Sequence, residues 1–183
     1  MILVRHCQSE FNAAFSRTRV DPGIADPGLT REGRMQAAGL GQSLAGKGID
    51  RIVTSPYRRA LQTAGTIAAA LEVPVEINPL VRERAAFVCD IGTPASELAR
   101  DWPAYDFSHI EEIWWPALEE SEHEVQDRAR LFCGEIVAAG VWESMLVVSH
   151  WGFIRQLTGQ RVENGAVLRF DPRALAVVPD IHP

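Results

Sequence analysis

The feature that most constrains this chain is a repeated unit, a short apolar segment that ends abruptly in polar residues and is followed by a helical pattern. Segments of this kind occupy residues 1–5, 51–54 and 145–149. Short apolar runs without polar alternation are typical of strands buried on both faces of a parallel sheet. Further short strands are expected at 75–77, 166–170 and 175–178.

The segments between these strands have helical periodicity. Thr30 can cap a helix over residues 31–47. Ser55 and Pro56 predict the start of another, because a serine side chain caps free N–H groups and proline is tolerated in the first helical turn. The apolar residues of that helix recur every three or four positions. Two more helices are expected, one from Ser121 and one over 152–158.

Strands that alternate with amphipathic helices predict an α/β fold, with three α/β/α layers around a mostly parallel central sheet. Residues 84–118 interrupt this pattern, because they contain three prolines and no long periodic helix. We expect them to form a small irregular cap insertion, with one short helix near 95–101. The length of 183 residues is typical of one domain, so residues 1–183 are expected to form a single unit.

Composition excludes several classes of protein. Hydrophobic residues make up 46% and charged residues 23%, which is ordinary for a globular chain. The net charge of −6 argues against a nucleic-acid partner, and no apolar run is long enough to cross a membrane. The first charge follows after four residues, too soon for a signal peptide, so a cytoplasmic location is expected. Three widely spaced cysteines predict neither a disulfide framework nor a zinc site.

Reactive residues follow three of the expected strands. Arg5 and His6 end the first, Arg58 follows the second in a first helical turn, and His150 follows the late one. The carboxyl ends of parallel strands meet at one sheet edge, so these four side chains are expected to converge. Arginine matches phosphate oxygens, and neutral imidazole is a nucleophile near pH 7. The cluster therefore indicates phosphoryl transfer. Glu10, Glu76 and Glu83 are all candidates for the acid.

The motifs around these residues resemble those of the histidine phosphatase (phosphoglycerate-mutase-like) superfamily. LVRHCQSEFN resembles its R-H-G-x-[ST]-x-x-N signature, and SPYRRALQTA resembles its S-P-x-x-R-A-x-Q-T helix. PGLTREGRMQAAGLG, LVRER and VVSHWGFIRQL resemble further segments of the family. The matches cover most of residues 2–83 and 145–157.

The resemblance implies a role for each matching residue. His6 would accept the phosphoryl group as a covalent phosphohistidine, and Glu83 would be the general acid and base. Four groups would hold the phosphate, namely Arg5, Asn12, Arg58 and His150. Gln8 and Ser9 would line the pocket. The implied reaction is hydrolysis of a small phosphate monoester that needs no metal and no organic cofactor.

Two residues depart from the family pattern. Cys7 stands where glycine is usual, and its position beside Arg5 and His6 suggests a thiol of lowered pKa. Trp151 stands where small residues are common and predicts a bulkier pocket. The aromatic residues of the insertion, such as Trp114 and Trp115, allow two interpretations. They form either a satellite core or a cover for the leaving group.

Three other functions are alternatives to a histidine phosphatase. Nucleophilic attack by Cys7 would need arginine at position 13, where the chain has Ala13. The resemblance implies that a phosphomutase would keep a longer insertion between the acid and the second histidine than the 67 positions from Glu83 to His150. A non-catalytic module that binds phosphorylated ligands would not need every catalytic residue type. A phosphatase is therefore the preferred reading.

Overall fold

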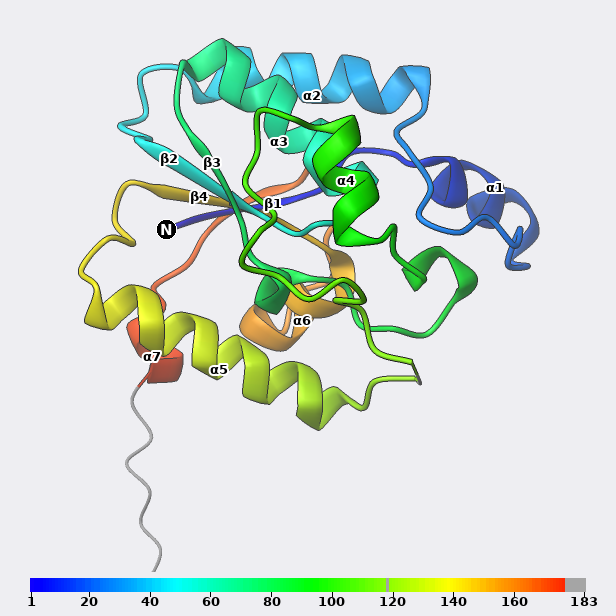
Figure 1. Cartoon of the computed structure of the whole chain (residues 1–183). Coiled ribbons are helices and arrows are strands. Elements are labelled where there is room, and N and C mark those ends of the chain that lie inside the picture. The colour runs from blue at the N-terminus through cyan, green and yellow to red at the C-terminus, as the bar shows by residue number, and fades with distance from the viewer. Residues whose placement is uncertain (118, 177–183) are drawn as a thin grey trace, which may run out of the picture.

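A five-stranded sheet forms the centre of the molecule. The computed structural model describes residues 1–117 and 119–176, and Figure 1 shows their arrangement. The sheet order is β3-β2-β4-β1-β5, and all neighbours are parallel except β5, which pairs antiparallel with β1. The strands are β1 (Ile2–Arg5), β2 (Arg51–Thr54), β3 (Val75–Ile77), β4 (Met145–Ser149) and β5 (Val167–Arg169).

Helices cover both faces of this sheet, above and below it in Figure 1. One face carries α2 (Arg31–Leu44) and α3 (Arg58–Leu71), and the other carries α5 (Glu122–Ala138) and α6 (Trp151–Thr158). The remaining helical segments are α1 (Glu10–Thr18), α4 (Ala95–Asp101), α7 (Arg173–Ala176) and the 3₁₀ turns η1 (Pro79–Val81) and η2 (Val88–Asp90). The three-layer α/β/α prediction is confirmed.

Strand β1 shows why the apolar runs need no polar alternation. Successive side chains point to opposite faces of a sheet. Leu3 accordingly packs in the core under α5 and α6, whereas Ile2 and Val4 pack in the core under α2 and α3. Both faces are covered, so every position of the strand except its last is buried.

The expected elements differ from the observed ones mainly at their ends. The helix over 31–47 stops at Leu44, and Gly46 and Gly48 follow with positive φ angles that few other residues adopt. The strand expected at 175–178 is wrong for its first two residues, which belong to α7, whereas 177 and 178 lie outside the described residues.

Helix α1 was not expected, because it has few apolar residues to produce a periodic pattern. Its start is fixed by a reciprocal cap, in which the Ser9 side chain accepts from the Asn12 backbone N–H while the Asn12 side chain accepts from the Ser9 backbone. This arrangement is a capping box in which Asn12 takes the place of the usual Glu or Gln, so the sequence did not match the common pattern.

The insertion contains the expected short helix, α4, and a satellite core. Trp114 is buried there, lies 4.6 Å from the Tyr57 ring and donates its indole N–H to the Thr93 carbonyl at 2.9 Å. Trp115 packs edge-on against it. The satellite-core reading of these aromatics is therefore correct. In the described part of the chain, no helix is long and apolar enough to cross a membrane.

Candidate active site

The two histidines meet because their strands are neighbours. β1 and β4 pair in parallel with Arg5 opposite Ser149, so His6 and His150 leave the sheet side by side. The His6 backbone N–H continues the ladder by donating to the Ser149 carbonyl at 2.9 Å. The two imidazole rings lie 5.0 Å apart, although 144 positions separate them in the chain. Both rings are buried.

The hydrogen bond of the His6 ring assigns its tautomer. Nδ1 lies 2.8 Å from the Cys7 carbonyl oxygen, which can only accept, so Nδ1 carries the proton. Nε2 then carries a free lone pair. Burial, followed by the charges of Arg59 and Arg5, holds the pKa of His6 well below its usual 6.5. The ring therefore stays neutral and nucleophilic at neutral pH.

His150 presents both ring nitrogens without a hydrogen-bond partner among the described residues, although the side chain is fully buried. A buried polar atom left unpaired costs free energy, which makes such atoms strong candidates for ligand contact. The ring is held edge-on against Tyr57 at 5.2 Å. Burial and the charge of Arg59 lower its pKa well below 6.5.

Two arginines, Arg5 and Arg59, line the same cavity as His6. Arg5 donates from one terminal nitrogen to the Val162 carbonyl at 2.6 Å, and its buried Nε has no partner among the described residues. Arg59 is buried and donates to the Cys89 carbonyl at 2.8 Å and to the Asp90 carboxylate at 3.0 Å. Its guanidinium also stacks over Tyr57 at 4.3 Å.

The structure corrects one expected site residue, because Arg58 does not join this group. Its guanidinium points to the insertion, where it donates to Thr93 at 3.2 Å and Asp101 at 2.9 Å and stacks on Trp102. Successive helical residues face directions about 100° apart, so only one of two adjacent arginines can face the histidines. Arg59 is that residue. The arginine of the motif S-P-x-x-R-A falls at position 59, so the spacing of the motif indicates Arg59 and not Arg58.

Glu83 reaches the cavity from the turn after η1. Its Oε1 accepts the backbone N–H groups of Arg84 at 2.9 Å and Gly152 at 2.8 Å. A β-carbon at position 152 would lie 2.5 Å from this oxygen, so the contact requires glycine. Burial, followed by the negative charge of Asp90, raises the pKa of Glu83 above its usual 4.5. A raised pKa favours the protonated form that a general acid needs. Glu10 and Glu76 are not part of the cavity wall.

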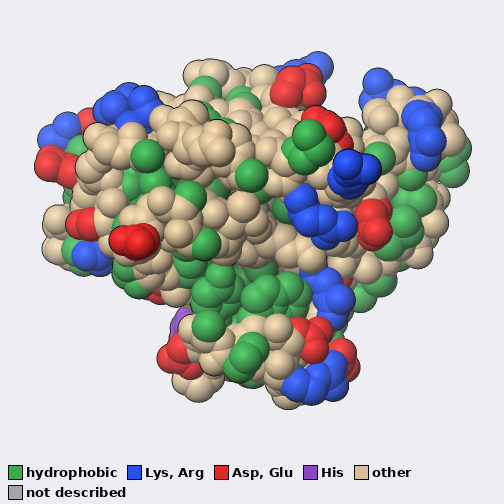
Figure 2. All heavy atoms as spheres, turned by 90° about the horizontal axis from the view of Figure 1, so that it is seen from above, with side chains coloured by type: hydrophobic (Ala, Val, Ile, Leu, Met, Phe, Trp, Pro, Cys, Tyr) green, Lys and Arg blue, Asp and Glu red, His purple; other side chains and the backbone are tan. Residues whose placement is uncertain are grey.

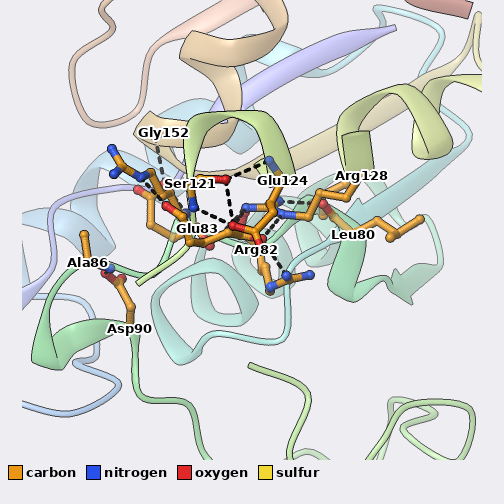
Figure 3. A network of polar contacts seen from close by, with 12 residues as sticks. Leu80, Arg82, Glu83, Ala86, Asp90, Ser121, Glu124, Arg128 and Gly152 are labelled. Atoms are coloured by element: carbon orange, nitrogen blue, oxygen red, sulfur yellow. Dashed lines mark hydrogen bonds and ion pairs between the residues drawn. The ribbon is translucent and has the colours of Figure 1, made fainter. Parts of the chain in front are cut away.

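A buried ion pair fixes the backbone that carries Glu83, as Figure 3 shows. Arg128, from α5, donates to the carbonyls of Leu80 at 2.7 Å, Arg82 at 2.8 Å and Glu83 at 3.2 Å. The Glu120 carboxylate pairs with the same guanidinium at 2.7 and 2.9 Å. Both side chains are buried. The pair therefore acts as a clamp on residues 80–83.

Of the three polar residues expected on the first loop, Ser9 and Asn12 line the cavity and Gln8 does not. The Asn12 amide oxygen accepts from Ser9 and Asn164, which turns the amide nitrogen of Asn12 toward other acceptors. The Gln8 side chain instead accepts from the Thr30 hydroxyl at 2.8 Å, outside the cavity. Asn164 was missed because no expected element contains it.

The two departures from the motif have different outcomes. Cys7 packs with Leu29 and Ala37 in a small apolar cluster, and burial raises the pKa of its thiol to about 11. The expected lowered pKa is therefore wrong, and the thiol is unreactive at neutral pH. Trp151 lies on the cavity wall, as expected.

The cavity itself holds about 530 Å³ and has two chemically distinct ends. Its inner wall carries Arg5, His6, Arg59 and Glu83, and its outer wall carries Phe11, Phe15 and Phe87. Among the described residues, no cluster of three His, Cys, Asp or Glu side chains has the geometry to hold a metal ion. The inner end pairs a neutral nucleophile with positive charge, the arrangement that phosphoryl transfer needs.

Residues 1–176 match the histidine phosphatase superfamily (branch 1), and the chain belongs to this family. Its relatives that are named phosphatases support the predicted class, a phosphoric monoester hydrolase. The chain is 32% identical over 188 residues to a glucosyl-3-phosphoglycerate phosphatase of Mycolicibacterium vanbaalenii, a match that covers 92% of this chain and 78% of the relative.

Two further likenesses are more limited. Phosphoserine phosphatase 1 of Hydrogenobacter thermophilus is 40% identical over 75 residues, which is 41% of this chain and 34% of that protein. The solved structure of a mycobacterial glucosyl-3-phosphoglycerate phosphatase superposes with a TM-score of 0.64 at 22% identity, covering 91% of this chain and 87% of the other. At that identity the superposition supports the shared fold alone.

Proposed function

We propose that the protein hydrolyses small phosphate monoesters through a covalent phosphohistidine on His6, with Glu83 as general acid and base. The observation that carries this proposal is His6 on the arginine-lined wall of the cavity, with the buried imidazole ring of His150 5.0 Å from its own. The tautomer of His6 leaves Nε2 free to attack phosphorus.

In the first step, His6 Nε2 forms a bond to phosphorus while the bond from phosphorus to the ester oxygen breaks. Protonated Glu83 gives its proton to the departing alcohol. Arg5, Arg59 and His150 stabilise the charge on the transferring phosphoryl oxygens, which is the largest contribution expected from the protein. The unpaired nitrogens of Arg5 and His150 support this role.

In the second step, water attacks the phosphohistidine and Glu83, now ionised, takes the proton from that water. The phosphorus–nitrogen bond breaks, inorganic phosphate leaves, and His6 returns to its neutral form. Glu83 carries out both proton transfers in these two steps. We therefore predict that the reaction needs no metal ion and no organic cofactor.

The test is incubation with 3-phosphoglycerate and, separately, phosphoserine, followed by ³¹P NMR. We expect inorganic phosphate from at least one ester, and no phosphate from the His6→Ala variant. Conversion of 3-phosphoglycerate to its 2-phospho isomer without phosphate release would instead support a phosphomutase. Tight phosphate binding without turnover of any ester would support a binding module.

A further inference from the structure

The outer end of the cavity is formed by three phenylalanines from two distant parts of the chain. Phe11 and Phe15 lie one turn apart on α1, with their rings stacked at 5.2 Å and an interplanar angle of 13°. Phe87, which precedes η2 in the insertion, lies 5.5 Å from each of them. We call these three residues the aromatic wall.

The aromatic wall is unlike the satellite core of the insertion. Trp114 in that core is 6% exposed, whereas Phe87 is 46% exposed and its neighbour Val88 is 37% exposed. Figure 2 shows apolar side chains reaching the surface on the lobe of α1, at the right. Apolar rings left open at the rim of a cavity are typical of ligand-binding walls, because a ligand completes their burial.

Two arginines lie near the wall, and one of them is paired with a carboxylate. Arg84 donates to the Glu119 carboxylate at 2.8 Å and to the Glu120 carbonyl at 2.6 Å. The Arg19 guanidinium lies 6.0 Å from the Phe15 ring, on the aromatic wall itself. Arg5 and Arg59 thus lie beside His6, where the phosphate is proposed to bind, whereas the aromatic wall lines the cavity together with Arg19 and Arg84.

We propose that the leaving groups of the preferred substrates carry a flat apolar ring, which packs against Phe11, Phe15 and Phe87 while the phosphate lies beside His6. This inference rests on the phosphatase function proposed above and names its substrate class. Aromatic rings prefer offset or edge-to-face contact at 4.5–7 Å, a geometry that the tilted Phe87 and the stacked α1 pair both offer to a further ring.

The test compares two esters of primary alcohols, 2-phenylethyl phosphate and ethyl phosphate, whose leaving groups are similar in acidity. The quantity measured is the ratio of their kcat/KM values. We expect a ratio of about 10 or more for the unmodified protein, and a fall to about 2 in the Phe15→Ala, Phe87→Ala double variant. Ile113→Ala, which removes an exposed apolar side chain of the insertion outside the cavity, is expected to leave the ratio unchanged.

The outcomes separate this inference from the function on which it rests. A ratio near one in the unmodified protein, or a ratio that survives the double variant, overturns the inference and leaves the phosphatase function standing. Absence of turnover of both esters, together with no phosphate release from the esters tested above, overturns both. Phe15→Leu is expected to give an intermediate ratio, since it keeps an apolar group but loses the flat ring.

Discussion

The two ends of the cavity are built in different ways. At the inner end, Arg5 and His6 come from the end of β1, and His150 lies beside His6 at the end of the paired strand β4, where the backbone ladder fixes their positions. The outer end takes its rings from α1 and from the irregular insertion, and Phe87 remains 46% exposed. The two histidines are polar and buried, whereas Phe87 at the outer end is apolar and open to solvent.

This difference separates the chemistry of the site from its selectivity. Residues at strand ends hold reacting groups in place, because the sheet cannot shift without breaking its core. Loops and peripheral helices tolerate change, so they are suited to setting which leaving group fits. Substitutions at the inner end should lower turnover of every ester, and substitutions at the outer end should change the ranking of esters.

The largest expected effect separates the two adjacent arginines. Arg59→Ala should lower kcat/KM by roughly 10³-fold for every ester, because it removes a charged donor from the proposed phosphate site. Arg58→Ala should lower it by no more than about threefold, since Arg58 contacts the insertion. Steady-state kinetics with a check of thermal unfolding measure both. A greater loss in Arg58→Ala would contradict the corrected assignment.

Glu83→Gln should lower kcat by about 10²- to 10³-fold, because glutamine cannot donate or accept the transferred proton.

In the unmodified protein, kcat/KM should rise with pH through a His6 pKa that lies below 6.5, since the nucleophile must be neutral. It should fall through a Glu83 pKa raised above 4.5, since the acid must be protonated. If the pH profile of kcat/KM for Glu83→Gln loses only its falling limb, Glu83 is the general acid. If the falling limb remains, Glu83 is not the group that titrates there.

The Glu120–Arg128 clamp should affect both stability and turnover. Arg128→Met leaves the buried Glu120 carboxylate with only Arg82 as a partner and frees the carbonyls of residues 80–83, so we expect about 2 kcal/mol less free energy of unfolding. We also expect kcat to fall by about tenfold through misplacement of Glu83. Urea unfolding and kinetics measure the two effects.

The double variant Glu120→Leu, Arg128→Met provides the control for this clamp. It should recover part of the stability, because the buried Glu120 carboxylate is gone, although Arg82 then lacks its ion-pair partner. It should not recover kcat, because the carbonyls still lack their donor. Full recovery of both would show that the pair contributes only to stability.

The smallest effect is expected for Gln8→Ala. Its side chain accepts from Thr30 and does not reach the cavity, so kcat/KM should change by no more than about twofold. Asn12→Ala serves as the comparison, because Asn12 lines the cavity. A loss in Gln8→Ala as large as that in Asn12→Ala would place Gln8 in the site after all.

The inner end was largely predictable from the sequence and the outer end was not. Arg5, His6 and His150 follow apolar runs, and the rule that parallel strands end at one edge brings them together. Arg58 was predicted in place of Arg59 because it lies in the first helical turn, where free backbone N–H groups favour an anion. The structure instead buries Arg59 at the site. It is accommodated there by Asp90, which lies 31 positions away in the insertion.

The aromatic wall was not predicted from the sequence. Phe11 and Phe15 lie one turn apart in a helix of only nine residues, which is too short to establish a period, and Phe87 lies in a segment without regular structure. Their contact depends on tertiary packing between α1 and the insertion. The environment of Cys7 also depends on tertiary packing. Its neighbours in the chain suggested an activated thiol, but its side chain packs in an apolar cluster.

The most direct test of the phosphohistidine is a rapid denaturing quench, without acid, during turnover of a ³²P-labelled phosphate monoester. The account predicts a covalent phosphate that is labile in acid and stable in alkali, absent from His6→Ala and retained in Cys7→Ser. Label that persists in His6→Ala, or turnover with no trapped label at any quench time, would contradict nucleophilic attack by His6.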